Sequence, residues 1–189
     1  MKDLLIREAS INDAKELLEI YKPYVLNTAI SFEYEVPSLN EFKTRIENTL
    51  KDYPYIVAIK DNKILGYAYA SEFKGRKAYQ YSVETSIYVK INSKREGIGK
   101  QLYLELEKIL KKQGILNLNA CIGYTEREDD DRLTNDSEKF HKALGYKLVG
   151  KFHKCGYKFG KWYDMIWVEK MIGNHNDDMP DIIRYSDIK

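Results

Sequence analysis

Cysteine is scarce in this sequence, and a long apolar run is missing altogether. The 189 residues contain two cysteines, Cys121 and Cys155, which cannot form a disulfide framework and which indicate a reducing compartment. No stretch reaches the ~18 to 20 uninterrupted apolar residues of a membrane span, and the first residues lack the apolar segment of a secretory signal. We therefore expect a cytoplasmic protein that has no membrane partner.

An excess of charge of one sign is also missing. Lysine and arginine together number 31 and aspartate and glutamate 29, so the formal net charge is +2. Nucleic-acid-binding proteins normally carry a clear basic excess or a basic stripe, so we expect no nucleic-acid partner. Hydrophobic residues make up 43% of the chain, which is enough for one domain with a sizeable core. We expect that domain over residues 1–172 and a polar C-terminal tail over residues 173–189.

Patterns typical of helices and strands alternate along the chain, which predicts an α/β (α+β) domain. A hairpin is expected over 55–71, with its turn at 61–63, and a long strand over 79–91. The last two strands are expected over 146–153 and 162–169, joined by a loop that contains Gly156 and Gly160.

Helix starts are expected at residues with capping side chains. Asn12 is a candidate N-cap for a first helix, in which Pro23 is expected to cause a kink or a split. Ser38 is expected to cap a second helix. An amphipathic helix is predicted from Ile98 to near Gly114.

The most informative motif is the turn from Ser93 to Lys100, between a predicted strand and a predicted helix. Gly97 and Gly99 allow the backbone to turn tightly and to approach a ligand closely. The helix that follows presents free N–H groups and the positive end of its dipole. Three basic residues accompany the turn: Lys94, Arg95 and Lys100. Together these features predict a site for a phosphate or pyrophosphate.

Two other phosphate-binding motifs do not fit this turn. A P-loop needs glycine at the position of Lys94, and serine or threonine where Gln101 follows Lys100. A dinucleotide-binding fingerprint needs a third glycine, where this chain has Leu102.

The turn resembles the Gln/Arg-x-x-Gly-x-Gly/Ala motif of the GNAT superfamily of N-acetyltransferases, which binds the pyrophosphate of acetyl-CoA. Lys94 stands where the family has glutamine or arginine, and lysine also donates to phosphate. The order of predicted elements over residues 4–170 resembles the GNAT fold, which has a mixed, mostly antiparallel central sheet flanked by helices. The segments most similar to phosphinothricin N-acetyltransferases are 28–37, 53–55, 76–79, 83–89, 140–146 and 156–164.

The resemblance implies two catalytic residues. Strand alternation points Glu84 away from Val83 and Thr85, and the resemblance makes Glu84 the general base, acting directly or through a water; otherwise it is an ordinary solvent-facing glutamate. His141 would protonate the departing thiolate, since imidazole titrates near neutral pH. By itself, however, the sequence fits a packing histidine equally well.

The resemblance also assigns acetyl-CoA contacts. The backbone of Ile87, Tyr88 and Val89 would pair with the pantetheine arm as an added strand would, and one of these amides would polarise the thioester carbonyl. We take Asn135 as the counterpart of the asparagine that lies near the cofactor in this family. The expected pyrophosphate-binding residues are those of the turn: Lys94, Arg95, Glu96, Gly97, Ile98, Gly99 and Lys100.

The expected substrate contacts are Phe32, Glu33, Arg76, Tyr79, Tyr157 and Trp162. Arg76 is the strongest of these, because a guanidinium can hold a carboxylate with two parallel hydrogen bonds. Each aromatic residue, taken singly, is also compatible with core packing. Lys158 adjoins Tyr157 in the loop expected there.

We expect no metal site. The acidic run over residues 126–131 lacks the glycine and the terminal glutamate of a calcium-binding loop, so a solvated loop is expected. Cys121 and Cys155 are expected to be buried hydrophobic residues and not nucleophiles.

The resemblance implies an acetyl-CoA-dependent N-acetyltransferase. Its substrate would be the primary amine of a small amino acid or of an analogue such as phosphinothricin or methionine sulfoximine, which attacks the thioester directly in a ternary complex. The resemblance implies a homodimer. Two alternatives remain open: a protein N-terminal acetyltransferase, and a non-catalytic acyl-CoA-binding module that would need neither Glu84 nor His141.

Overall fold

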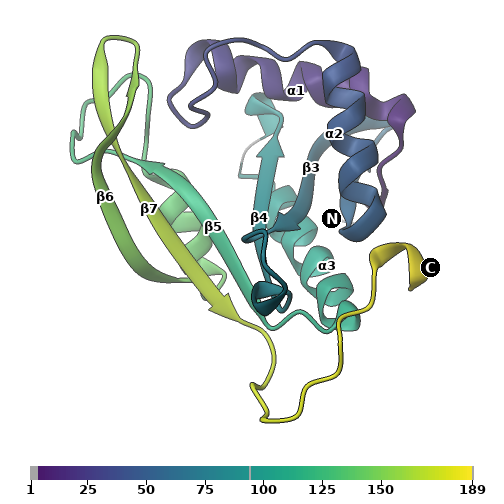
Figure 1. The fold of residues 1–189 in the computed structure, drawn as a ribbon. Coiled ribbons are helices and arrows are strands. Elements are labelled where there is room, and N and C mark those ends of the chain that lie inside the picture. Colours follow the sequence, from purple (N-terminus) through teal and green to yellow (C-terminus); the bar gives the residue numbers. More distant parts are fainter. Residues whose placement is uncertain (1–3, 94, 189) are drawn as a thin grey trace. The chain divides into compact units, whose positions relative to one another are not determined.

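The computed structural model describes residues 4–93 and 95–188, which form a mixed α/β protein (Figure 1). The predicted fold class is confirmed. Contacts along the chain separate two compact units: residues 1–20, 37–118 and 171–189 form the first, and residues 21–36 and 119–170 the second. The helices are α1 (Ala14–Asn27), α2 (Leu39–Asp52), α3 (Ile98–Gln113) and α4 (Asp136–Ala143). The strands are β1 (Leu5–Glu8), β2 (Tyr55–Lys60), β3 (Lys63–Glu72), β4 (Ser82–Val89), β5 (Asn117–Tyr124), β6 (Lys147–Lys158) and β7 (Lys161–Met171).

In the first unit, β1, β2, β3 and β4 pair in sequence order, and every neighbour is antiparallel. Asp61 and Asn62 join β2 to β3 with positive φ values of 49° and 58°, as the tight hairpin turn predicted here requires. Helix α3 packs against β2, β3 and β4, and α2 packs against β2 and β3. The predicted hairpin, long strand and amphipathic helix are therefore all present.

Tyrosine side chains form much of the core of the first unit. The sequence has 16 tyrosines but only 6 phenylalanines. Tyr67 of β3 is 1% exposed, and its ring stacks on Tyr55 at a centroid distance of 5.6 Å and lies 5.4 Å from Tyr88. Tyr55 and Tyr69 stack at 4.8 Å. Tyrosine suits this position because its ring packs as a hydrophobic group and its hydroxyl can still reach a polar partner.

The structure corrects the first predicted N-cap and excludes one of the two outcomes expected at Pro23, the split. Helix α1 is preceded by a single 3-10 turn whose N-cap is Ser10 and not Asn12; the Asp13 carboxylate accepts a hydrogen bond from the Ser10 amide at 2.8 Å. The expected split at Pro23 does not occur, because α1 continues through that residue. Ser38 does cap α2, since its hydroxyl accepts from the Glu41 amide at 3.2 Å.

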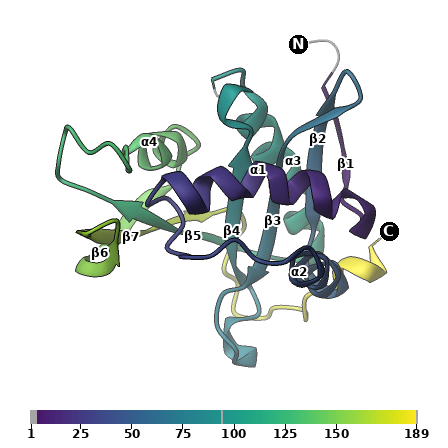
Figure 2. The same ribbon diagram turned by 90° about the horizontal axis from the view of Figure 1, so that it is seen from above.

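The second unit contains β5, β6, β7 and α4, with the strand order β5-β7-β6 (Figure 2). The prediction of a loop between residues 153 and 162 is wrong. Strand β6 continues to Lys158 through an irregularity between Phe152 and Gly156, and the true turn is Phe159-Gly160, with φ values of 52° and 74°. Left-handed backbone at both turn residues is the geometry of a tight hairpin.

The residues expected to form a polar tail pack against the first unit. Tyr185 is 7% exposed and bonds to the Glu8 side chain, and burial is the main reason that the pKa of its hydroxyl is raised. Asp181 accepts a hydrogen bond from Gln80 at 3.1 Å. This segment is thus part of the folded unit.

Candidate active site

Glu84 lies near one end of the β3–β4 hairpin, opposite Ser71. Its neighbours Val83 and Thr85 are 0% and 3% exposed, whereas Glu84 itself is half-buried, as the predicted alternation requires. Burial raises the pKa of the Glu84 carboxyl, and the charge of Lys74 acts in the opposite direction. A carboxyl group of raised pKa is suited to accept a proton near neutral pH.

The connection from β3 to β4 carries Arg76 and Tyr79. Arg76 is exposed, and a 3-10 turn, Lys77–Tyr79, follows it directly. Tyr79 is 41% exposed, and its ring meets that of Phe73 edge-on at 6.0 Å. The antiparallel register therefore brings Glu84 close to the connection that carries both predicted substrate contacts.

Residues near the C-terminus fix the end of this connection. The Tyr81 hydroxyl donates to the Pro180 carbonyl at 3.1 Å, and Gln80 donates to Asp181. Lys77 lies 3.4 Å from the same carboxylate. No feature of the sequence indicated this contact, because the two segments are about 100 residues apart.

The predicted pyrophosphate turn has the backbone that such a site needs. Lys94 lies outside the described residues. Arg95 and Gly97 have positive φ values of 69° and 77°, and α3 begins at Ile98, which is buried. Among the described residues no side chain caps the start of α3, so its first N–H groups can meet an anion. The exposed Arg95 and Lys100 add positive charge there; Glu96 is also exposed, and Gly99 lies in the first turn.

Three predicted cofactor residues form the end of β4. Ile87, Tyr88 and Val89 pair with Ala68, Tyr67 and Gly66 of β3. A Cβ atom on Gly66 would lie 2.9 Å from the Tyr88 carbonyl oxygen, so glycine permits this close pairing. Their expected backbone contacts with the pantetheine arm stay a prediction.

The remaining predicted substrate contacts lie in the second unit. The Phe32 ring packs 6.4 Å from that of Tyr163. Tyr157 and Trp162 face each other across the β6–β7 hairpin, with ring centroids 5.0 Å apart. Phe32, Tyr157 and Trp162 are 36%, 49% and 54% exposed, so they are not core residues. Half-exposed aromatic rings are suited to bind a ligand.

Lys158 is a buried residue at the end of β6. It is 2% exposed, and its ammonium group donates to three backbone carbonyls of the segment 25–31. Burial lowers the pKa of Lys158, and the charge of Glu33 raises it. Lys158 was expected in a loop with Tyr157; strand alternation from the buried Gly156 would have indicated that Lys158 points inward.

His141 is buried inside the second unit, on α4. It is 3% exposed, and its Nδ1 atom lies 2.7 Å from the Ser137 carbonyl oxygen. Burial lowers the pKa of the ring to about 4. A carbonyl oxygen only accepts, so we assign the proton of the neutral ring to Nδ1. A neutral ring must gain a proton before it can protonate a thiolate, and that expected role stays a prediction.

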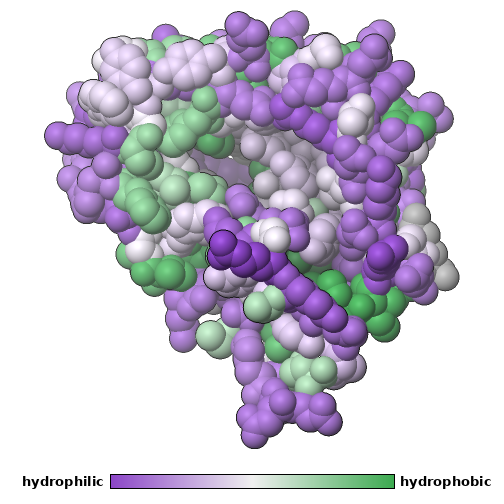
Figure 3. Space-filling view, in the orientation of Figure 1, coloured by the Kyte–Doolittle hydropathy of each residue, from purple (hydrophilic) through white to green (hydrophobic). Residues whose placement is uncertain are grey.

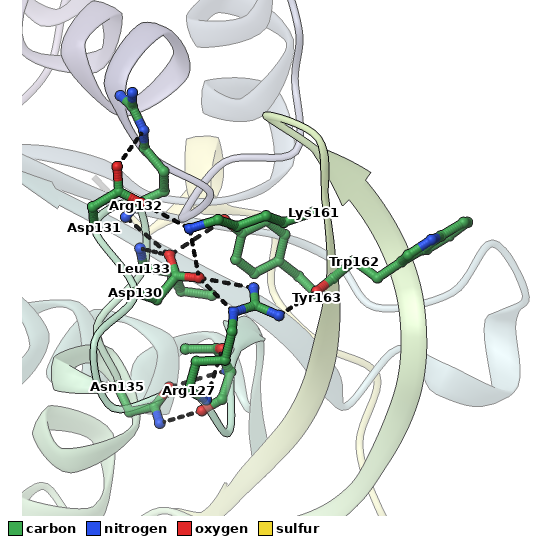
Figure 4. A network of polar contacts seen from close by, with 10 residues as sticks. Arg127, Asp130, Asp131, Arg132, Leu133, Asn135, Lys161, Trp162 and Tyr163 are labelled. Atoms are coloured by element: carbon green, nitrogen blue, oxygen red, sulfur yellow. Dashed lines mark hydrogen bonds and ion pairs between the residues drawn. The ribbon is translucent and has the colours of Figure 1, made fainter.

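The acidic loop between β5 and α4 is not simply solvated, as had been expected. Asp130 is 8% exposed, and its carboxylate accepts from the Arg132 and Leu133 amides at 2.9 and 3.0 Å. Arg127 donates to it at 2.8 Å, and Lys161 of β7 lies 3.6 Å away (Figure 4). Burial alone would raise the pKa of Asp130, but these hydrogen bonds and charges lower it overall. In a run of consecutive acidic residues, no sequence signal singled out Asp130.

Asn135 closes the same loop. Its side-chain amide donates to the Thr125 carbonyl at 2.7 Å, and its side-chain oxygen accepts from the Thr125 amide at 3.3 Å. The contact expected between Asn135 and the cofactor stays a prediction.

Three further expectations concern cysteines, metals and membranes. Cys121 and Cys155 are exposed and not buried as expected, and within the described residues they form no disulfide. Over residues 4–93 and 95–188, no histidine, cysteine and carboxylate side chains cluster as metal ligands would. No helix in the described part of the chain combines the length and the apolar character that crossing a membrane requires.

Hydrophobic side chains gather over the β6–β7 ribbon on the face drawn in Figure 3. On β6, Leu148, Val149 and Phe152 are 61%, 58% and 56% exposed. Neighbouring exposed apolar residues of this size are typical of an interaction surface.

Comparison with known proteins gives consistent matches over most of the chain. The family described as acetyltransferase (GNAT) domain matches residues 6–167. The phosphinothricin N-acetyltransferase of Streptomyces viridochromogenes is 34% identical over 161 residues, which cover 85% of this chain and 83% of that protein. The L-methionine sulfoximine/L-methionine sulfone acetyltransferase of Pseudomonas aeruginosa is 30% identical over 169 residues, covering 87% and 92%.

The solved structures agree with these matches. The GNAT superfamily phosphinothricin acetyltransferase from Sinorhizobium meliloti, in complex with AcCoA, aligns with a TM-score of 0.85 at 32% identity. The alignment covers 98% of this chain and 97% of that chain.

Proposed function

This chain belongs to the GNAT family of acetyltransferases, and on that premise we propose that it acetylates the primary amine of a small amino acid or amino-acid analogue. The predicted family, enzyme class and cofactor are confirmed, and acetyl-CoA is the acetyl donor. Substrates of the phosphinothricin or methionine sulfoximine type are the first candidates, because relatives that are named for them match most of the chain. The half-buried Glu84 beside the connection that carries Arg76 is the structural observation that supports this proposal best.

The residues of the site supply the binding groups for such a substrate. Arg76 offers two parallel N–H donors to a carboxylate. Tyr79 in the first unit, and Phe32, Tyr157 and Trp162 in the second, each offer exposed aromatic surface of the kind that binds a ligand. Glu33 follows Phe32 and would contact the ammonium end of the substrate.

The cofactor-binding residues hold the acetyl donor. Bound acetyl-CoA supplies the acetyl group as a thioester. The first N–H groups of α3, with Arg95 and Lys100, would bind its pyrophosphate. Ile87, Tyr88 and Val89 would hold the arm through their backbone, and one of their amides would donate to the thioester oxygen.

Glu84 would carry the proton transfer. Its carboxylate takes a proton from the substrate ammonium, directly or through a water, so that the nitrogen lone pair can attack the thioester carbon. The new C–N bond forms, the C–S bond breaks, and the thiolate leaves with the sulfur electron pair. The nitrogen gives up a second proton as it becomes an amide, and this proton balances the one that the thiolate takes up. Protonation of that thiolate by His141 is part of the proposal, although the buried neutral ring must first gain a proton.

We also propose that the enzyme works in the cytoplasm as a homodimer. Two exposed cysteines without a disulfide between them fit a reducing compartment. The exposed apolar residues of β6 offer a surface for a second copy. Light scattering coupled to size exclusion tests the dimer, and Leu148→Glu should weaken it.

A thiol-release assay tests the function. Purified protein and acetyl-CoA are incubated with free amino acids, with phosphinothricin and methionine sulfoximine, and with peptides of free N-terminus. Turnover of a free amino acid or analogue is expected. Turnover of peptides alone would instead indicate a protein N-terminal acetyltransferase, and binding of acetyl-CoA without any turnover an acyl-CoA-binding module.

A further inference from the structure

The Lys158 ammonium group has three protons, and each of them has a carbonyl acceptor. Its Nζ atom lies 2.8 Å from the Val25 oxygen, 2.9 Å from the Thr28 oxygen and 2.6 Å from the Ser31 oxygen. All three acceptors belong to the end of α1 and the segment directly after it. One side chain therefore replaces solvent as the donor to three backbone carbonyl groups.

We propose that Lys158 is a positioning residue that fixes the segment 28–34 and, with it, the proposed substrate contact Phe32. This inference rests on the proposed function, since Phe32 and Glu33 are the substrate contacts of that segment. It assigns to Lys158 no contact with substrate. Its effect is transmitted through the backbone that carries Phe32.

The chemistry explains why a cation is used here. Val25 lies in the last turn of α1, where carbonyl groups have no partner inside the helix and the dipole is negative. Burying an ammonium group is costly unless its hydrogen bonds are satisfied, and here all of them are. A serine or an asparagine could satisfy only one or two of these carbonyls.

The same segment is held at three other points of the second unit. A Cβ atom on Gly156, two residues before Lys158, would lie 2.4 Å from the Phe32 ring, so this glycine provides the space that the ring occupies. A Cβ atom on Gly123 would lie 2.9 Å from the Ala29 carbonyl. The Tyr34 hydroxyl donates to the Tyr157 carbonyl. Lys158 is thus one of several residues of the second unit that contact the segment 28–34, together with Gly123, Gly156 and Tyr157.

Lys158→Met tests the proposal, because methionine keeps the length of the side chain and removes all three donors. We expect the KM for the amine to rise about tenfold, which corresponds to about 1.4 kcal/mol, while the KM for acetyl-CoA stays within about twofold of the wild type. Deuterium exchange in the peptide covering residues 28–34 should become faster. Lys147→Met is the matched control: it lies on the same strand and is exposed, and it should change neither quantity.

Gly156→Ala is the second variant, in case Lys158→Met does not fold. Gly156 has no positive φ, so alanine is tolerated by the backbone and displaces only the edge of the Phe32 ring. It should also raise the KM for the amine and leave the KM for acetyl-CoA unchanged. An unchanged KM for the amine in Gly156→Ala, or in a folded Lys158→Met, would overturn the proposal. So would an equal rise of both KM values.

If the proposed function itself is wrong, the same experiments give a different result. In that case the wild-type protein and Lys147→Met would turn over no amine, whereas the exchange of residues 28–34 would still report whether Lys158 holds the segment.

Discussion

Gln113 of α3 and Ile183 of the C-terminal segment are hydrogen-bonded to each other in both directions. The Gln113 side-chain amide donates to the Ile183 carbonyl at 2.9 Å, and the Ile183 amide donates to the Gln113 carbonyl at 2.9 Å. The same side chain also donates to the Asp52 carbonyl, at the end of α2, at 2.8 Å. Gln113 is 0% exposed, so one buried amide joins α2, α3 and the C-terminal segment.

Gln113→Ala should therefore destabilise the protein. Two part-buried hydrogen bonds, to the Asp52 and Ile183 carbonyl groups, are lost. A hydrogen bond of this kind contributes about 1 kcal/mol, so we expect a loss of about 2 kcal/mol in the free energy of unfolding. Urea titration followed by circular dichroism measures it. Lys112→Ala, on the exposed face of α3, is the control and should change stability by less than about 0.5 kcal/mol. Equal stabilities would show that the C-terminal segment is not held by Gln113.

Glu84→Gln should lower kcat about 100-fold or more, which is the usual contribution of a general base, and should leave the affinity for acetyl-CoA unchanged. The free energy of unfolding of this variant should instead increase near neutral pH. Since burial raises the pKa of Glu84, ionising it at neutral pH costs folding free energy, and this cost disappears in acid where the carboxyl is protonated in both states.

The variant should thus melt at a higher temperature than the wild type near neutral pH but not in acid. Glu72→Gln, on β3 of the same hairpin, is the control for kcat. Full activity of Glu84→Gln across the pH range would contradict the assignment of the base.

His141 should make stability depend on pH. Its folded pKa is about 4, below the ordinary 6.5. Below pH 6.5 the unfolded chain gains a proton at this histidine and the folded chain does not, so stability falls until about pH 4 and changes no further below it. The full effect is about 3 kcal/mol.

Comparison with His141→Phe isolates this effect, because phenylalanine keeps a ring and cannot titrate. The stability advantage of the wild type at pH 7 should shrink steadily between pH 6.5 and pH 4. A constant difference between the two proteins over that interval would mean that His141 is protonated in the folded state.

Asp130→Ala should destabilise the loop between β5 and α4 by about 2 kcal/mol, since hydrogen bonds to a charged group contribute about 1.5 to 3 kcal/mol. Because the folded pKa of Asp130 is lowered, its contribution is complete at neutral pH and is lost only as the pH falls through the folded pKa. Asp129→Ala removes an exposed neighbouring carboxylate and is the control. Thermal unfolding at pH 7 should separate the two variants, and identical curves would contradict the role of Asp130.

The candidate site was predictable where it depends on local backbone. Gly97 has the positive φ value that a glycine at a tight turn indicated, and Glu84 alternates with buried neighbours as strand periodicity requires. Both features depend only on residues adjacent in the chain. The prediction failed at β6, which continues through the expected loop to Lys158. Gly156 leaves the space there for the ring of Phe32, a residue distant in the chain.

By itself, the sequence determined the fold class, the glycine turn before α3 and the family, because periodicity, glycine positions and motif order are local properties. Only the tertiary structure decided which individual charged and polar residues are buried. Lys158 and Asp130 look like ordinary surface charges in the sequence, and Gln113 like any polar residue of a helix. Each is buried because carbonyl groups or cations from distant segments meet it there, and whether such partners converge depends on the packed fold and not on neighbouring residues.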